Sequence, residues 1–101
     1  MTEQERLTDI INVTLKKLGV DREGSWNGDK YIIPLKDSNE FSKLYTALDK
    51  FEEADLDFES MLMSDSSGIL VYLTDDLDIT LKADFDDDKY MLIFEGADVD
   101  A

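Results

Sequence analysis

Cysteine and histidine are both absent from this sequence of 101 residues. Without cysteine the chain has neither disulfides nor thiolate chemistry. Without histidine it lacks the commonest general base and the commonest side-chain metal ligand. Gly-rich phosphate loops, Ser/His/Asp sets and zinc-ligand spacings are missing as well. We therefore expect that the protein is not an enzyme and uses no cofactor.

Long apolar runs are also missing, because no segment approaches the ~18 consecutive apolar residues of a membrane span. Residues 2–6 are charged or polar, unlike the apolar centre of a secretion signal. We expect no membrane contact and a cytoplasmic location. The length suits one domain, and 43% hydrophobic residues suffice for a core. That domain is predicted over residues 1–96, with a flexible acidic tail over 97–101.

Positive charge is scarce, and nearly all of it lies in the first half of the chain. Residues 1–50 carry 9 acidic and 8 basic side chains (net −1), whereas residues 51–101 carry 16 acidic and 2 basic ones (net −14), which sums to −15. This sign repels nucleic acid and anionic membranes. It attracts cationic partners, above all proteins that hold nucleic acid. An acidic surface that serves solubility, as in halophiles, would extend over the whole chain and does not match the near-neutral first half. The preference of aspartate for turns explains only part of the acidic excess.

Two helices are predicted, over residues 2–18 and about 38–53, from apolar side chains at helical spacing. Each is apolar on one side only, so each should lie with that side on a sheet. Gly19 is a natural stop for the first helix. Each helix begins with a capping box, formed by Thr2 with Glu5 and by Asp37 with Glu40.

From about residue 56 the apolar period changes from 3.6 to 2, which is typical of strands. Strands are predicted over 30–36, 56–63, 69–74, 78–85 and 89–95, with a further short strand around 23–26. The Asn27-Gly28 pair predicts a hairpin turn, and Pro34 favours an edge position. The fold class is therefore α+β, with two helices on one face of a four- to six-stranded, mainly antiparallel sheet in the order α-β-α-β-β-β-β. Trp26 either anchors a partner or, as we favour, folds over the sheet edge.

The last hairpin assigns side chains to the two faces of the sheet. If Asp87-Asp88 form the turn, then Phe85 lies opposite Tyr90 and both belong to an apolar face that carries the helices. The opposite face then holds Met91 and Ile93, with Asp84 and Lys82 among them. A slip of one residue would bury the acids, so this assignment of faces is strongly determined.

Strand 56–63 extends this uncovered face, because Met61 and Met63 alternate with Asp57 and Glu59 on one side of it. An apolar centre rimmed by charge is typical of a protein interface, and methionine adapts to a partner. The alternative is that these methionines are core residues, since strand 69–74 is apolar on both sides and leaves its buried face open. The candidate partner-binding residues are Asp57, Glu59, Asp75, Asp76, Asp78, Asp84, Asp86, Asp87, Asp88, Met61, Met63 and Met91.

Four positions match the spacing of a calcium-binding loop: Asp84, Asp86, Asp88 and Glu95. Lys89 stands where the sharp turn of that loop needs glycine, and the flanking segments are predicted as strands. Such a match arises easily in a chain rich in aspartate. We therefore expect no metal site, and whether the three aspartates bind a cation stays open.

In size, acidity and its layout of helices and an antiparallel sheet, the chain resembles phage-encoded DNA mimics. These include uracil-DNA glycosylase inhibitor, anti-restriction proteins and acidic anti-CRISPR proteins. The resemblance concerns composition and layout over the whole chain. It implies a stoichiometric inhibitor in the bacterial host, with a nuclease, restriction enzyme, CRISPR effector or polymerase as its basic partner.

Two other functions use the same features. A nuclease-toxin immunity protein would use the same charge against a different basic target. A scaffold or homodimer would instead use the methionine-containing face, with the acids serving solubility. Binding by charge weakens steeply with salt, whereas binding through the apolar face survives it.

Overall fold

The two amphipathic segments form helices, and their ends follow from local hydrogen bonds. The computed structural model describes residues 3–20, 22–51, 55–56, 62–63, 67–74 and 76–96. Helix α1 spans Glu3–Leu18 and helix α2 spans Ser38–Asp49. Both predicted helices are therefore present, although α2 ends earlier than expected. Thr2 of the first predicted capping box lies outside the described residues, as do the predicted tail residues 97–101.

Helix α1 ends in a Schellman motif. Gly19 has a φ of +77°, its N–H donates to the Lys16 carbonyl at 3.2 Å, and the Val20 N–H donates to the Leu15 carbonyl at 2.9 Å. At the start of α2, the Asp37 carboxylate accepts a hydrogen bond from the Glu40 N–H at 3.0 Å. The sequence identified both of these ends.

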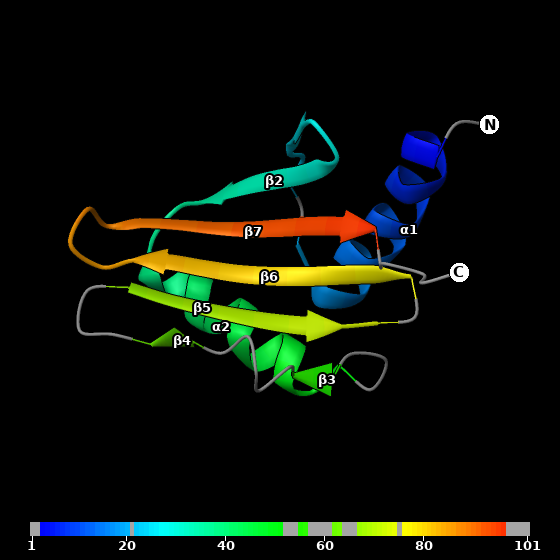
Figure 1. Ribbon diagram of the computed structural model, residues 1–101. Coiled ribbons are helices and arrows are strands. Elements are labelled where there is room, and N and C mark those ends of the chain that lie inside the picture. The colour runs from blue at the N-terminus through cyan, green and yellow to red at the C-terminus, as the bar shows by residue number, and fades with distance from the viewer. Residues whose placement is uncertain are drawn as a thin grey trace.

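The strands form one antiparallel sheet in the order β1-β2-β7-β6-β5-β3, with β4 also pairing with β5 (Figure 1). Figure 1 looks onto this sheet with both helices behind it. The predicted α+β class and element order are confirmed. The strand bounds are β1 Ser25–Asn27, β2 Lys30–Leu35, β3 Asp55–Leu56, β4 Leu62–Met63, β5 Ser67–Leu73, β6 Leu77–Asp84 and β7 Lys89–Gly96.

The core lies between the sheet and the helices. Alternate residues of β5, β6 and β7 are buried there, so strand 69–74 buries Leu70 and Tyr72 toward the helices. The most completely buried side chains include Ile11, Ile33, Leu48, Leu77, Ile79, Leu81, Leu92 and Phe94. No helix within the described residues is long and apolar enough to cross a membrane.

The β1–β2 hairpin turns one residue later than Asn-Gly chemistry predicts. Asn27 pairs with Lys30, so Gly28, with a φ of +66°, is the first of two turn residues, as in a type II′ turn. Trp26 is half-buried and packs edge-on against Tyr31, with ring centroids 5.3 Å apart. Its predicted packing role is confirmed.

Pro34 lies where β2 has a neighbour on one side only, because β1 pairs no further than Ile32. Its carbonyl accepts a hydrogen bond from Arg22 at 3.3 Å, on the free side of the strand. The backbone N and carbonyl of one strand residue point to the same side of the strand. The N of Pro34, which carries no hydrogen, therefore also faces away from β7, and no hydrogen bond to β7 is lost. The predicted edge position explains how the strand tolerates proline.

The register of the β6–β7 hairpin differs from the prediction by two residues. Asp84 pairs with Lys89 and Ala83 with Tyr90, which leaves a four-residue turn, Phe85–Asp88, in place of Asp87-Asp88 alone. The expected pairing of Phe85 with Tyr90 is therefore wrong. The faces are nevertheless as predicted, because a shift of two residues preserves the alternation of a strand.

The predicted strand 56–63 is represented by β3 and β4. Leu56 pairs with Tyr72, whereas Leu62 pairs with Ile69, so the two pairings with β5 differ in register by three residues. Position 63 pairs with Gly68, in the buried row of Ala83 and Tyr90. The side chain of Met63 lies outside what the structure describes, so its predicted place on the uncovered face stays a prediction.

Candidate functional site

The turn between β6 and β7 gathers aspartates at one end of the sheet, where yellow meets orange in Figure 1. Asp86, Asp87 and Asp88 are exposed, and Asp84 at the end of β6 is partly exposed. We call these four residues the acidic tip. The structure thus brings together four of the residues that the sequence predicted for partner binding.

The acidic tip is held in shape partly by its own side chains. The Asp84 carboxylate accepts a hydrogen bond from the Asp87 N–H at 3.2 Å. Asp88 has a φ of +54°, in the left-handed region that aspartate and asparagine enter more readily than most residues. The carboxylates are therefore presented on a defined turn.

Three aromatic rings attach the acidic tip to α2. Phe85 is 41% exposed, yet its ring lies 6.4 Å from that of Phe41 and 6.0 Å from that of Tyr90, while Phe41 and Tyr90 are 5.6 Å apart. Burial raises the pKa of Tyr90, and hydrogen bonding of its hydroxyl to the Asp88 carboxylate adds to the effect. The Tyr90 hydroxyl also interacts with Ser38, at the start of α2. The turn is thus fixed to the helix layer.

Over the described residues, the face of the sheet opposite the helices is less acidic than the sequence suggested. We call it the open face and describe it by three rows of residues that lie side by side on β2, β7, β6 and β5. The central row is Ile32, Ile93, Thr80 and Val71; the tip-side row is Pro34, Met91, Lys82 and Ile69; the far row is Lys30, Glu95, Asp78 and Leu73.

On the described residues of β2, β7, β6 and β5, acids and bases are balanced on the open face. Glu95 lies between Lys30 and Asp78 in the far row, and Asp84 lies beside Lys89 at the tip end. Of the predicted apolar centre, Met91 and Ile93 are described, and both are partly exposed on this face. The carboxylates predicted around this centre lie beside lysines that balance their charge. The acidic excess of the described residues therefore lies at the turns.

The remaining predicted residues divide into two groups. Asp76 is exposed in the β5–β6 turn and Asp78 follows it on β6, both at the opposite end of the sheet from the acidic tip. The Thr74 hydroxyl accepts hydrogen bonds from the N–H groups of Asp76 and Leu77 in that turn. The structure does not describe Asp57, Glu59, Met61 and Asp75.

The calcium-loop interpretation fails on geometry. Glu95 is six residues beyond Lys89 along β7, so it lies roughly 20 Å from the acidic tip at ~3.3 Å per residue. Among the described residues, no three acidic side chains are close enough together to hold a metal ion. The spacing reflects a strand–turn–strand segment.

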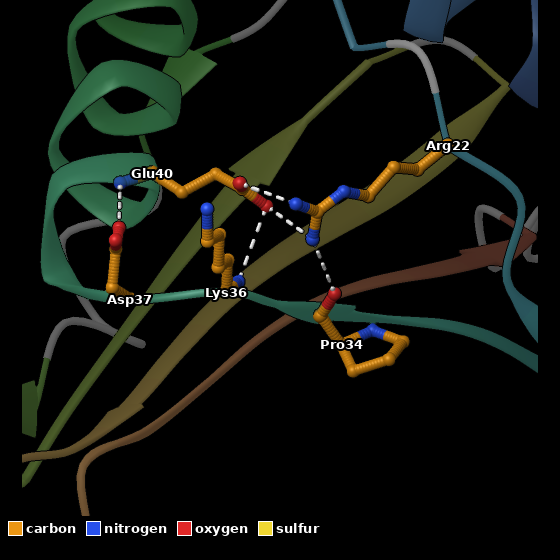
Figure 2. A network of polar contacts seen from close by, with 5 residues as sticks. All are labelled: Arg22, Pro34, Lys36, Asp37 and Glu40. Atoms are coloured by element: carbon orange, nitrogen blue, oxygen red, sulfur yellow. Dashed lines mark hydrogen bonds and ion pairs between the residues drawn. The ribbon is translucent and has the colours of Figure 1, made fainter.

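A cleft of about 500 Å³ separates the end of α1 from the start of α2. Arg22 crosses it and pairs with Glu40, with Nη1–Oε1 and Nη2–Oε2 distances of 2.6 and 2.8 Å (Figure 2). Glu40 also accepts the Lys36 N–H at 3.3 Å, so its side chain does not complete the predicted capping box with Asp37. This network joins the α1–β1 connection to the edge of β2. Because Arg22 is neutralised by Glu40, we assign the cleft a structural role.

The buried hydroxyl of Tyr72 provides a test of the core. The residue is 1% exposed, and its hydroxyl has no hydrogen-bond partner among the residues that the structure describes. Removing an unpaired buried hydroxyl relieves its desolvation penalty, so Tyr72→Phe should raise the free energy of unfolding by about 1 kcal/mol. Urea denaturation at neutral pH measures this, with Tyr45→Phe, at a 43% exposed site, as the control. A destabilised Tyr72→Phe variant would contradict the expectation.

Burial, with Tyr45 and Asp49 nearby, raises the pKa of Tyr72 to about 12. The folded chain then keeps a proton that the unfolded chain loses above its ordinary pKa of ~10. The stability contributed by this proton is present below pH 10 and is lost as the pH rises toward 12. In the Tyr72→Phe variant, the free energy of unfolding should therefore fall less between pH 10 and pH 12 than in the original chain.

Comparisons with protein-family models, with curated proteins and with solved structures found no match to the chain.

Proposed function

We propose that the protein is a stoichiometric inhibitor that imitates the charge of nucleic acid and blocks a basic nucleic-acid-binding protein. The observation that supports this most is the acidic tip, where a turn anchored by aromatic rings presents four aspartates at the exposed end of a hairpin. Nucleic acid presents negative charge in a similar way, as closely spaced anions on a backbone.

The anchoring favours the proposal energetically. Immobilising a flexible side chain or loop at an interface costs about 0.5–1.5 kcal/mol for each side chain. The Asp87–Asp84 hydrogen bond and the contacts of Phe85 fix the turn before a partner arrives. The net charge of −15 adds long-range steering toward a basic cleft. Such steering raises the association rate and weakens as salt increases.

The partner that fits is a protein with a basic groove for nucleic acid, such as a nuclease, a restriction enzyme, a CRISPR effector or a polymerase. Such partners occur in the bacterial cytoplasm, so we place the protein there, in the host cell of a phage. The protein itself binds neither nucleic acid nor membrane in this account, because both would be repelled by its charge.

A pull-down identifies the partner. The tagged protein is incubated with bacterial lysate treated with nuclease, so that nucleic acid cannot bridge, and bound proteins are eluted with a salt gradient. We expect one discrete nucleic-acid-handling protein, released at moderate salt. A partner that is indifferent to salt, or none at all from lysates of several hosts, would count against mimicry.

A further inference from the structure

We propose that the open face is the interface between two copies of this chain. The inference does not depend on the proposed inhibition. Within the described residues both helices lie on the other side of the sheet. The open face carries partly exposed apolar side chains on three strands: Ile32 on β2, Ile69 and Val71 on β5, and Met91 and Ile93 on β7. A sheet face exposed to water normally alternates to polar residues, so an apolar one indicates an interaction surface.

The charges of the open face favour a second copy over an unrelated partner. Lys82 and Lys89 are the two basic residues of the acidic half, and both lie on this face toward the acidic tip. With Asp84 they give that end a net charge of +1. At the opposite end, Lys30, Glu95 and Asp78 give a net charge of −1. One end of the face therefore complements the other.

The two copies can pack face to face if a two-fold axis runs along the central row of the open face. Such an axis places Ile93 of one copy on Ile93 of the other and reverses the strand direction. The tip-side row of each copy then covers the far row of its partner. On β6 and β5 this placement is complementary, with Lys82 over Asp78 and Ile69 over Leu73. On β7 and β2 it places Met91 over Glu95 and Pro34 over Lys30.

The size of the face sets the strength of the dimer. Four strands ~4.8 Å apart and about seven residues long cover roughly 20 by 25 Å, or on the order of 500 Å² per copy. This is below the ~800 Å² per partner of a standard interface. Each copy also carries a net charge of −15, and the same arrangement brings each acidic tip toward the Asp76 turn of the partner. We therefore expect a weak dimer, with a Kd on the order of 10 µM, that added salt strengthens by screening repulsion.

Sedimentation velocity of the full chain between about 5 and 500 µM, in about 0.5 M salt, tests this. The mass should rise from monomer toward dimer over this range. Ile93→Asp should abolish the rise, whereas Val13→Asp, at a 53% exposed site on α1, should leave it unchanged. A chain that stays monomeric throughout, or a dimer that resists Ile93→Asp, would overturn the proposal.

A charge exchange tests the arrangement without disturbing the apolar centre. Lys82→Glu alone and Asp78→Lys alone should each weaken the dimer roughly tenfold, because each contact occurs twice in the two-fold pair. The double variant should restore association to near that of the original chain. Failure of the double variant to do so, with all variants folded by circular dichroism, would contradict the pairing. Because no target protein is needed, this result is separate from the outcome of the pull-down.

Discussion

Changing Asp86, Asp87 and Asp88 together to asparagine is expected to weaken binding to the captured partner by about 100-fold in about 0.1 M salt. We assign roughly 1 kcal/mol to each charge that meets a basic groove, and ~1.4 kcal/mol corresponds to a factor of ten. Asparagine keeps the size of the side chain and tolerates the φ of +54° at position 88. The turn and its aromatic anchor should therefore persist, as a thermal melt can verify.

The matched control changes the same amount of charge elsewhere. Asp9, Asp29 and Asp49 are exposed and lie outside the acidic tip. Changing them to asparagine moves the net charge from −15 to −12, as the tip variant also does. We expect this control to bind within about threefold of the original chain, because distant surface charges are screened at a Debye length of ~10 Å. Equal weakening by both variants, measured by calorimetry, would show that only total charge matters.

Gly24→Ala is expected to lower the free energy of unfolding by about 3 kcal/mol, which is a large share of the stability of a small domain. A Cβ at this position would overlap the Ile32 carbonyl oxygen and lie 2.7 Å from Ile33 Cγ1. The first is strand backbone and the second belongs to a fully buried side chain, so neither can move aside cheaply. The Gly24 N–H also donates to the Tyr31 hydroxyl at 2.8 Å, which ties the same segment to β2.

Gly28→Ala provides the comparison. Gly28 has a φ of +66°, yet no atom of the described residues lies within 4 Å of the position of an added Cβ. Its cost is therefore conformational only, about 1 kcal/mol. Thermal melts should rank Gly24→Ala well below Gly28→Ala in melting temperature. The reverse order would show that the chain before β1 does not approach β2 as closely as the structure has it.

The fold was predictable where local chemistry and periodicity agree. Asp37 and Gly19 identify helix ends from side-chain type alone, because a carboxylate cap and a left-handed glycine are local requirements. The faces of β6 and β7 followed from alternation, which is insensitive to the two-residue error in register. The turn length itself depended on Phe85 leaving the strand to reach Phe41, a contact distant in sequence.

The site was only partly predictable, because charge balance on a sheet face depends on pairing between strands. Alternation along β6 and β7 places Asp78 on the face of Asp84 and Glu95 on the face of Met91. The neighbouring Lys30 is assigned to this face only by the pairing of β2 with β7. Gly24 and Arg22 gave no sequence signal at all. Their roles arise from the approach of the α1–β1 connection to β2 and α2, which no local pattern encodes.

Competition with nucleic acid for the identified partner tests mimicry most directly. The partner is first bound to a labelled duplex or guide, and the protein is then titrated in while fluorescence anisotropy is followed. We predict complete displacement of the nucleic acid at one protein chain per binding groove, and about 100-fold weaker displacement by the Asp86/Asp87/Asp88 triple variant. A ternary complex, in which the protein binds while the nucleic acid stays bound, would contradict the account.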